Sequence, residues 1–367
     1  MLGSTLLSIL IVSSIAATLA AGLVVSERFL ADYGPCKITI NEERELTVQG
    51  GKPLLSMLTA EKIFIPSACG GRGTCGLCKV KVLEGARAIL PTEEPYLNKE
   101  ERAAQVRLSC QVKVKNDLRI QIPRELFSIR EYITRCTRIR DLTHDIKLFR
   151  FQLVEPATMD YIPGQYVQLQ TPAYEKSPTP VYRAYSIASD PAEKGIIELI
   201  IRLVPNGICT TYCFNHLKEG DEMRFNGPYG SFRLSDTQAP IVFIAGGSGM
   251  APIKCILHHM KNTQNQREAV YFFGANRVRD MFMVEEMRQF ESDLANFRFV
   301  PVVAKPQEGE TWNGQTGLVT QAVQRDVTNG AFCEAYLCGS PGMIEASIKV
   351  LNELGVTNDR VFYDKFA

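Results

Sequence analysis

The chain has 367 residues, which at about 150 residues per domain corresponds to two or three domains. It is 45% hydrophobic and 22% charged, close to soluble globular averages, which excludes a disordered or fibrous protein. Lys and Arg total 41 against 40 Asp and Glu, with no long block of one sign, so no electrostatic feature favours nucleic-acid binding. The 11 cysteines are too few for a disulfide scaffold, and three of them lie between Cys69 and Cys78, which is typical of a metal site.

The first predicted element is an apolar segment at 4–25, which contains 22 residues without a charge. As a helix it would extend about 33 Å, enough to cross the hydrocarbon core of a bilayer. A cleaved signal peptide is the alternative, but no Lys or Arg precedes the segment, and it is longer than a usual signal core. Arg28 is the first cation after the segment, which by the positive-inside rule favours a cytoplasmic location for the rest of the chain. We therefore expect a single-pass membrane helix and its linker in residues 1–35.

Residues 36–126 contain the cysteine pattern. Alternation predicts two short strands and a helix, over 37–41, 45–51 and 54–63. The cysteines follow as Cys69-x5-Cys75-x2-Cys78, and Cys110 comes after 31 further residues. Four thiolates satisfy a 2Fe-2S cluster, and the plant-type pattern has one residue fewer in its first gap. A zinc site is the alternative, but zinc sites usually show two compact cysteine pairs, whereas this is a three-plus-one set in a glycine-rich loop. The stretch resembles the ferredoxin-like domains fused to flavin reductases, which implies a β-grasp (α+β) fold.

Residues 127–236 show an all-β pattern with closely spaced turns. The predicted strands lie within 133–153, 161–171, 181–189, 195–204 and 221–232. The run Arg183-Ala184-Tyr185-Ser186 resembles the RxYS motif of the ferredoxin–NADP reductase superfamily, which implies an antiparallel β-barrel that binds FAD. By residue type, Arg183 offers a guanidinium for the flavin pyrophosphate, Tyr185 a ring for the isoalloxazine and Ser186 a hydroxyl near N5.

The same resemblance implies a second phosphate contact, because the superfamily has a Gly-x-x-Ser/Thr stretch further along the chain. Here Gly207 precedes Thr210 and Thr211, at the start of a short predicted helix whose N–H groups favour anions. Gly227 follows in a Gly-Pro-Tyr-Gly run. An Arg and a Tyr on a strand are commonly surface residues, so the order of the three motifs supports flavin binding more strongly than RxYS alone.

Residues 237–367 alternate strands and helices, which predicts an α/β, doubly wound parallel sheet that binds ligands at the carboxyl ends of its strands. Strands are expected within 269–280, 297–304 and 334–343. An earlier buried strand leads into Gly246, Gly247 and Gly249, which permit close backbone approach to a ligand. Pro252 follows in the first turn of a helix.

The run CGSPGM starts at Cys338 and Gly339, and it resembles the CGPPxM element that lies against the nicotinamide in the same superfamily. Here Ser340 replaces the first Pro of that element. The alternative for Cys338 is a buried residue at a strand end. Members of the superfamily often stack a C-terminal aromatic ring on the flavin, which in this chain implies Phe366.

Over nearly its whole length the chain resembles the NADH-oxidising subunits of the bacterial sodium-translocating NADH:quinone oxidoreductases, through motifs that include SACGGRGTCGLCKVKV, RLSCQVKV, RAYSIAS and GGSGMAPI. The resemblance implies that the chain oxidises NADH and sends electrons through FAD and a 2Fe-2S cluster to membrane subunits, where quinone reduction drives sodium export. It also implies the bacterial inner (cell) membrane, with the catalytic domains on the cytoplasmic side. Two other functions stay open: a membrane-attached reductase component of a multicomponent oxygenase, and a redox-sensing or assembly protein without turnover.

The choice between NADH and NADPH depends on the stretch after the second strand of the nucleotide domain. Arg277 and Arg279 by themselves favour the phosphate of NADPH. Asp280 stands three residues after Arg277, where it can pair with it and partly neutralise it. In the resembled family a similar Gly-Ala-x-Arg stretch accompanies NADH, so we predict NADH as the substrate.

Overall fold

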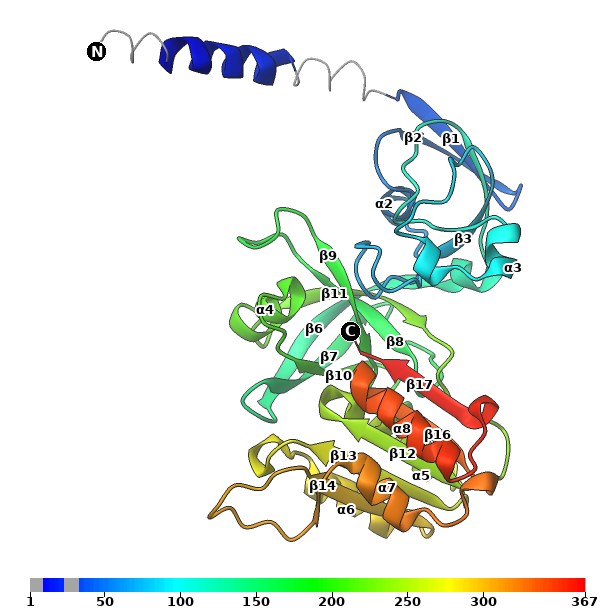
Figure 1. The fold of residues 1–367 in the computed structure, drawn as a ribbon, viewed down its shortest axis with the longest axis vertical. Coiled ribbons are helices and arrows are strands. Elements are labelled where there is room, and N and C mark those ends of the chain that lie inside the picture. Colours follow the sequence, from blue (N-terminus) through cyan, green and yellow to red (C-terminus); the bar gives the residue numbers. More distant parts are fainter. Residues whose placement is uncertain (1–8, 23–32, 367) are drawn as a thin grey trace. The chain divides into compact units, whose positions relative to one another are not determined.

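The protein is described here by a computed structural model that covers residues 9–22 and 33–366. The chain forms two compact units, Met1–Ser128 and Ile129–Ala367. Figure 1 follows them from blue and cyan in the first unit to green, yellow and red in the second.

The predicted membrane helix lies only partly within the described residues. Within the predicted 22-residue span the structure describes a helix over 9–22, and the remaining residues, 4–8 and 23–25, lie outside the described part. Within the described ranges, no helix has both the length and the apolar character needed to cross a membrane.

The first unit contains a five-stranded sheet in the order β2-β1-β5-β3-β4. Its strands are β1 (Pro35–Ile40), β2 (Arg44–Gln49), β3 (Lys79–Glu84), β4 (Val106–Leu108) and β5 (Leu118–Gln121), and its helices are α2 (Leu54–Ala60), α3 (Lys99–Ala103), η1 (Glu94–Tyr96) and η2 (Arg124–Ser128). β1 pairs parallel with β5, whereas the other pairs are antiparallel. The predicted strands at 37–41 and 45–51 and the helix at 54–63 correspond to β1, β2 and α2.

A buried ion pair fixes the segment that connects β3 to β4. Glu93 is fully buried, and its Oε1 accepts from Arg107 Nε at 3.0 Å. Its carboxylate also accepts from the backbone N–H groups of Leu90 and Leu108. Because breaking such a pair leaves an uncompensated buried charge, this contact ties the segment around residue 93 firmly to β4.

The first half of the second unit is a six-stranded antiparallel sheet in the order β10-β7-β6-β11-β8-β9. Its elements are β6 (Arg130–Asp141), β7 (Ile146–Glu155), β8 (Tyr166–Thr171), β9 (Val181–Ser186), β10 (Ile196–Arg202), α4 (Ile208–Asn215) and β11 (Glu222–Tyr229). The sheet forms a half-barrel around a buried core in which the rings of Phe151 and Phe225 meet edge to face at 4.9 Å. A single bridge between Ile187 and Leu199 joins its two sides beyond β9.

The second half is a six-stranded parallel sheet in the order β15-β14-β13-β12-β16-β17. Its strands are β12 (Ile241–Gly246), β13 (Ala269–Ala275), β14 (Phe297–Val303), β15 (Gln315–Thr316), β16 (Glu334–Gly339) and β17 (Val361–Lys365). Its helices are η3 (Gly247–Gly249), α5 (Met250–Asn262), η4 (Val278–Asp280), α6 (Val284–Asp293), α7 (Val319–Asp326), η5 (Gly330–Phe332), α8 (Pro341–Glu353) and η6 (Asn358–Arg360). The predicted doubly wound sheet is therefore present.

Alternate residues of β12 face two different cores. Phe243 and Ala245 pack with α5 and α6, whereas Val242 and Ile244 pack with α7 and α8. The core on the α5 side also contains half-barrel residues such as Leu148, so both halves of the second unit contribute to this core. The strand order reverses between β12 and β16, which is where ligands bind in open α/β sheets.

Candidate functional site

The four cysteines predicted to bind the cluster form two pairs. Cys69 and Cys75 bring their sulfurs to 3.4 Å, and Cys78 shares a side-chain hydrogen bond with Cys110. The bond from Cys75 lowers the pKa of Cys69, and the bond from Cys78 lowers the pKa of Cys110. The same hydrogen bonds raise the pKa of the partner thiols, Cys75 and Cys78.

This arrangement fits a binuclear cluster better than a single ion. A tetrahedral zinc site requires four ligands around one ion, whereas a 2Fe-2S cluster has two irons with two thiolates each. The two thiol pairs match the second requirement.

Glycines allow the loop between the cysteines to pack under neighbouring side chains. Gly76 has φ +69°, and a Cβ there would lie 2.6 Å from the ring of Tyr96. The Tyr96 hydroxyl donates to the Thr74 carbonyl at 3.0 Å, so the ring covers the loop and holds it. A side chain at position 76 would therefore displace the ring as well as strain the backbone.

The residues predicted to bind flavin lie on β9 and at the start of α4. Arg183, Tyr185 and Ser186 all belong to β9, and Gly207 directly precedes the first turn of α4. Burial raises the pKa of Tyr185, whose ring lies against the sheet core. Gly227 lies in the register shift between Asn226 and Tyr229 of the β11–β8 pairing; it has φ +154°, and a Cβ there would lie 3.1 Å from Val167.

The two threonines predicted near the phosphate differ in their partners. Thr210 Oγ1 accepts from Val204 N at 3.2 Å and donates to Val204 O at 3.3 Å, so its hydroxyl is used within the turn before α4. Thr211 Oγ1 accepts from Lys176 Nζ at 3.3 Å. A cation therefore lies beside Thr211, which suits an anionic group at this helix start.

Ser186 and Cys338, predicted from separate motifs, are connected through a residue that the sequence analysis did not identify. Ser186 Oγ donates to Asp364 Oδ2 at 3.5 Å, and Asp364 lies directly opposite Cys338 in the β16–β17 register. Burial raises the pKa of Asp364, and burial likewise raises the pKa of Cys338. The end of the flavin strand therefore meets the carboxyl ends of β16 and β17 at the half-buried carboxyl group of Asp364.

The glycine turn after β12 packs directly on the end of β16. A Cβ on Gly249 would lie 2.2 Å from the Cys338 carbonyl oxygen, so only glycine fits this approach. A Cβ on Gly246 would lie 3.1 Å from the sulfur of Met343, and Gly339 has φ +146°. Ser340, the departure from the CGPPxM element, caps α8 by accepting from Met343 N at 3.4 Å.

The remaining predicted nucleotide residues surround this point. Gly247 has φ +56° and an open flank, and Pro252 lies in the first turn of α5. Phe366 donates its backbone N–H to the Gly339 carbonyl at 2.9 Å, which brings the C-terminus to the same strand end. The structure thus gathers the glycine turn, Cys338, Gly339 and Phe366 at one edge of the sheet.

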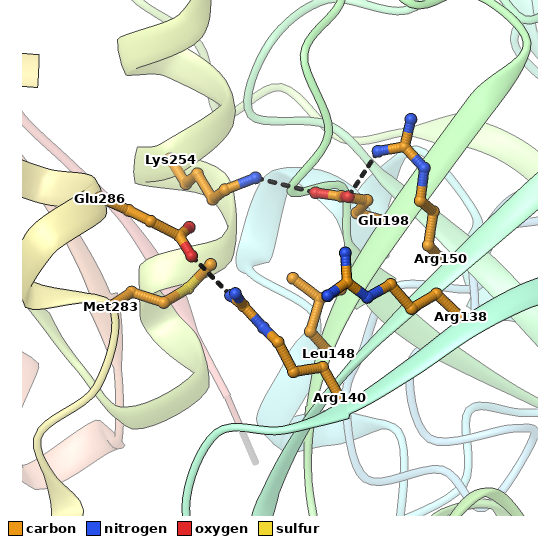
Figure 2. Close-up of a pocket in the computed structure, with 8 residues that line it drawn as sticks. All are labelled: Arg138, Arg140, Leu148, Arg150, Glu198, Lys254, Met283 and Glu286. Carbon is orange, nitrogen blue, oxygen red and sulfur yellow. Dashed lines mark hydrogen bonds and ion pairs between the residues drawn. The ribbon is translucent and has the colours of Figure 1, made fainter. Parts of the chain in front are cut away.

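A buried lysine connects α5 to the half-barrel (Figure 2). Lys254 Nζ donates to Glu198 Oε2 at 2.8 Å and to the Ala188 carbonyl at 3.0 Å. Glu198 also accepts from Arg150 Nη1 at 2.8 Å. These groups, with Arg140 paired to Glu286, line a pocket of about 180 Å³. Lys254 therefore links α5, the helix after the glycine turn, to Glu198 on β10, and Glu198 is bound in turn by Arg150 on β7.

Asp280 contacts both arginines implicated in nucleotide choice, although not as the sequence predicted. Its Oδ2 accepts from the backbone N–H of Arg277 at 3.1 Å, and its Oδ1 lies 3.8 Å from Arg279 Nε. His144 Nδ1 also lies 3.8 Å from Oδ1. The predicted side-chain ion pair of Arg277 with Asp280 is replaced by this backbone contact.

Comparison with protein families gives three matches along the chain. A 2Fe-2S iron-sulfur cluster binding domain matches residues 38–115, an oxidoreductase FAD-binding domain residues 134–234, and an oxidoreductase NAD-binding domain residues 243–349. The protein is therefore an oxidoreductase that uses FAD, NAD and a 2Fe-2S cluster, as predicted.

Two solved structures resemble the fold over most of the chain. A cytochrome P450 reductase from Amycolatopsis is 27% identical with a TM-score of 0.71, and the match covers 90% of this chain and 98% of that one. The ferredoxin reductase in carbazole 1,9a-dioxygenase is 26% identical with a TM-score of 0.69, and the match covers 91% and 98%.

Curated relatives match at higher identity and over more of the chain. The F subunit of the Na(+)-translocating NADH-quinone reductase of Neisseria gonorrhoeae is 34% identical, over 98% of this chain and 99% of its own. The corresponding F subunits of Psychrobacter arcticus and Pseudomonas aeruginosa are 34% and 33% identical, over 99% and 95% of this chain and 98% and 95% of their own. This chain therefore belongs to the family of F subunits of the Na(+)-translocating NADH-quinone reductases.

Proposed function

We propose that the chain binds NADH at the carboxyl ends of β12 and β16 and passes its electrons through FAD on β9 to the 2Fe-2S cluster. The observation that carries this proposal is the meeting of Ser186 and Cys338 at Asp364. It brings the flavin strand and the predicted nicotinamide strand close together, which hydride transfer requires. When bound, FAD takes up a two-electron hydride and hands on single electrons, and the cluster carries one electron at a time.

The residues of this chain have separate tasks in the proposal. Arg183 and Thr211, with Lys176 beside it, bind the pyrophosphate, while Thr210 holds the turn that presents them. Tyr185 supports the flavin ring, and Phe366 covers it from the C-terminus. Gly207 and Gly227 have no side chain, so the protein backbone can approach the cofactor closely at these positions.

On the nucleotide side, the backbone of the glycine turn and of Gly339 approaches the dinucleotide closely. Pro252 fixes the start of the following helix. Arg277 lies near the adenosine end. Cys338 lies against the nicotinamide. Ser186 places its hydroxyl near the hydride acceptor, and Asp364 orients that hydroxyl by accepting its hydrogen bond. Cys69, Cys75, Cys78 and Cys110 bind the two irons in the pairs described above.

We further propose that the electrons leave to other subunits of a membrane complex that reduces quinone and exports sodium, as the names of the relatives indicate for those proteins. The chain would then act at the cytoplasmic face of the bacterial inner membrane, attached through residues 1–35. The domain limits that we propose are 1–35, 36–126, 127–236 and 237–367.

A second candidate is the reductase component of an oxygenase, because one of the two solved structures reported above is the ferredoxin reductase in a dioxygenase. The two structures are 26–27% identical to this chain, whereas the Neisseria and Psychrobacter F subunits are 34% identical. The higher identity favours the respiratory function.

Removal of residues 1–35 from the purified complex tests the proposal. A member of such a complex should keep its oxidation of NADH with ferricyanide as acceptor and lose quinone reduction. An oxygenase reductase would lose neither ferricyanide reduction nor electron delivery to a soluble partner, so unchanged delivery would favour that function. A redox-sensing or assembly protein would show no steady-state turnover with any artificial acceptor.

A further inference from the structure

We propose that Gln111 raises the reduction potential of the cluster through a hydrogen bond to the sulfur of Cys110. Gln111 Nε2 donates to Cys110 Sγ at 3.5 Å. The inference rests on the proposed role of Cys110 as an iron ligand. In this proposal Gln111 donates a hydrogen bond to the ligand sulfur and does not contact iron.

The orientation of the Gln111 amide follows from its other partners. Thr92 Oγ1 donates to Gln111 Oε1 at 3.0 Å. A thiolate only accepts hydrogen bonds, so the –NH2 group must face Cys110 and the carbonyl oxygen must face Thr92. Both ends of the amide are therefore fixed by partners of the required kind.

The support for this amide is itself rigid. Thr92 directly precedes Glu93, whose carboxylate is bound by Arg107 and by two backbone N–H groups in the interior of the unit. On its other side the amide lies against the cysteine loop, because a Cβ on Gly73 would come within 2.6 Å of Gln111 Nε2. Gly73 has φ +77° and no side chain, so the Gln111 amide can occupy the space beside it.

A hydrogen bond to a ligand sulfur stabilises the more negatively charged state of a cluster, which is the reduced state. Cys110 is only 6% exposed, so water neither competes strongly for its sulfur nor screens the donor. The hydrogen bond from Gln111 therefore favours the reduced cluster and draws electrons toward it.

The test is a redox titration of the full chain with its cluster, followed by EPR. Gln111→Met keeps the length of the side chain and removes the donor. We expect the equilibrium constant for cluster reduction to fall about 3- to 10-fold, which for one electron is a potential lower by about 30–60 mV. Gln121→Met is the matched control, because Gln121 is exposed on β5 of the same unit, and its potential should equal that of the wild type.

A second variant keeps the result decisive if Gln111→Met fails to load its cluster. Thr92→Val leaves Gln111 in place but removes the group that orients its amide, so we expect a smaller fall in potential in the same direction. An unchanged potential in a cluster-loaded Gln111→Met, or in Thr92→Val where the first does not load, overturns the inference. If the wild-type chain itself shows no 2Fe-2S signal, the proposed function fails instead.

Discussion

The two units of the chain assemble their candidate sites in opposite ways. In the first unit the four cysteines lie within one loop and one strand end, between Cys69 and Cys110. In the second unit the central contact joins Ser186 to Asp364, which are 178 residues apart. A site made from neighbouring residues can be recognised from spacing alone, whereas a site assembled by topology has members that no local motif contains. Each prediction below tests one side of this contrast.

The largest expected effect concerns the local site. Cys75→Ala removes one ligand from an iron, and the cluster should then be lost because three thiolates and a methyl group cannot complete its coordination. We expect the EPR signal of the reduced cluster to disappear while FAD stays bound. Cys36→Ala is the control, since Cys36 is a cysteine of the same unit outside the two pairs, and it is more buried than Cys75. A native signal in Cys75→Ala would contradict the assignment of this ligand.

In the second unit, Lys254→Met should have the largest effect, on stability. The change leaves Glu198 with Arg150 alone, and we expect a loss of about 3 kcal/mol, at the low end of the range for breaking buried ion pairs. Lys194→Met is the control, because Lys194 pairs with Asp160 at the exposed surface, where a pair contributes less than about 1 kcal/mol. Urea unfolding of both variants measures the difference.

The pH dependence of the Lys254 effect has a defined sign. Burial acts to raise the pKa of Glu198, but its contacts with Lys254 and Arg150 outweigh burial, so the pKa is lowered. A carboxyl group with a lowered pKa in the folded state stabilises the fold above its ordinary pKa, and this stabilisation disappears as pH falls. The difference between wild type and Lys254→Met should therefore shrink on acidification. A difference that grows in acid would contradict the ion-pair explanation.

The third effect is on flavin affinity. Arg183→Leu removes a charged hydrogen bond to the proposed pyrophosphate, which contributes about 1.5–3 kcal/mol and therefore about 10- to 150-fold in the dissociation constant of FAD. Gel filtration followed by flavin absorbance measures the retained cofactor. Arg135→Leu, at an exposed position of β6, should retain FAD like the wild type. Full retention in Arg183→Leu would move the flavin site to another surface.

The fourth effect tests the connection made by topology. Asp364→Asn keeps an acceptor for Ser186 but removes the charge, and we expect hydride transfer in stopped-flow experiments to slow about 10- to 100-fold, equivalent to about 1.4–2.7 kcal/mol. FAD content should not change. Asp359→Asn, on η6 just before the same strand, is the control and should transfer hydride at the wild-type rate.

Stability provides an independent readout for Asp364. Burial raises its pKa, with the Ser186 hydrogen bond opposing this, so the folded protein favours the protonated carboxyl group. Wild-type stability should therefore decrease as pH rises through the carboxyl range, and Asp364→Asn should gain in melting temperature relative to wild type from acidic to neutral pH. Equal pH profiles for the two proteins would show that Asp364 is not buried in this way.

Most of the fold could be predicted, because alternation and glycine turns report local structure. The strands β1, β2 and β6–β14 all overlap segments predicted from such patterns. The last strand, β17, was not predicted, since its run VFYDKF has no turn signal and its pairing with β16 depends on the rest of the sheet.

The same limit explains which site residues were missed. Asp364 and Lys254 are single charged residues in apolar surroundings, and only tertiary structure gives them the partners Ser186 and Glu198. At the N-terminus, hydropathy predicted 22 helical residues over 4–25. The structure describes 9–22 of them, all helical, and the rest lie outside the described residues.

The smallest effect is the choice between NADH and NADPH. Arg277 and Arg279 would favour a 2′-phosphate by about 1.5–3 kcal/mol if both were available to clamp it. Asp280 places a carboxylate between them, bound to the backbone of Arg277 and 3.8 Å from Arg279, so a phosphate would meet a negative charge at the same place. We therefore expect kcat/KM to favour NADH by at least about tenfold, equivalent to about 1.4 kcal/mol.

Asp280→Asn sharpens this last test, because an amide oxygen can still accept from the Arg277 N–H while the charge is gone. The variant should lose most of the preference for NADH, through a gain in kcat/KM for NADPH and not a loss for NADH. Both cofactors have to be measured at equal ionic strength, since salt screens an exposed phosphate contact. A wild-type preference for NADPH would mean that the arginines bind the ribose phosphate despite Asp280. It would also weaken the respiratory assignment, because the proposed electron donor of that complex is NADH.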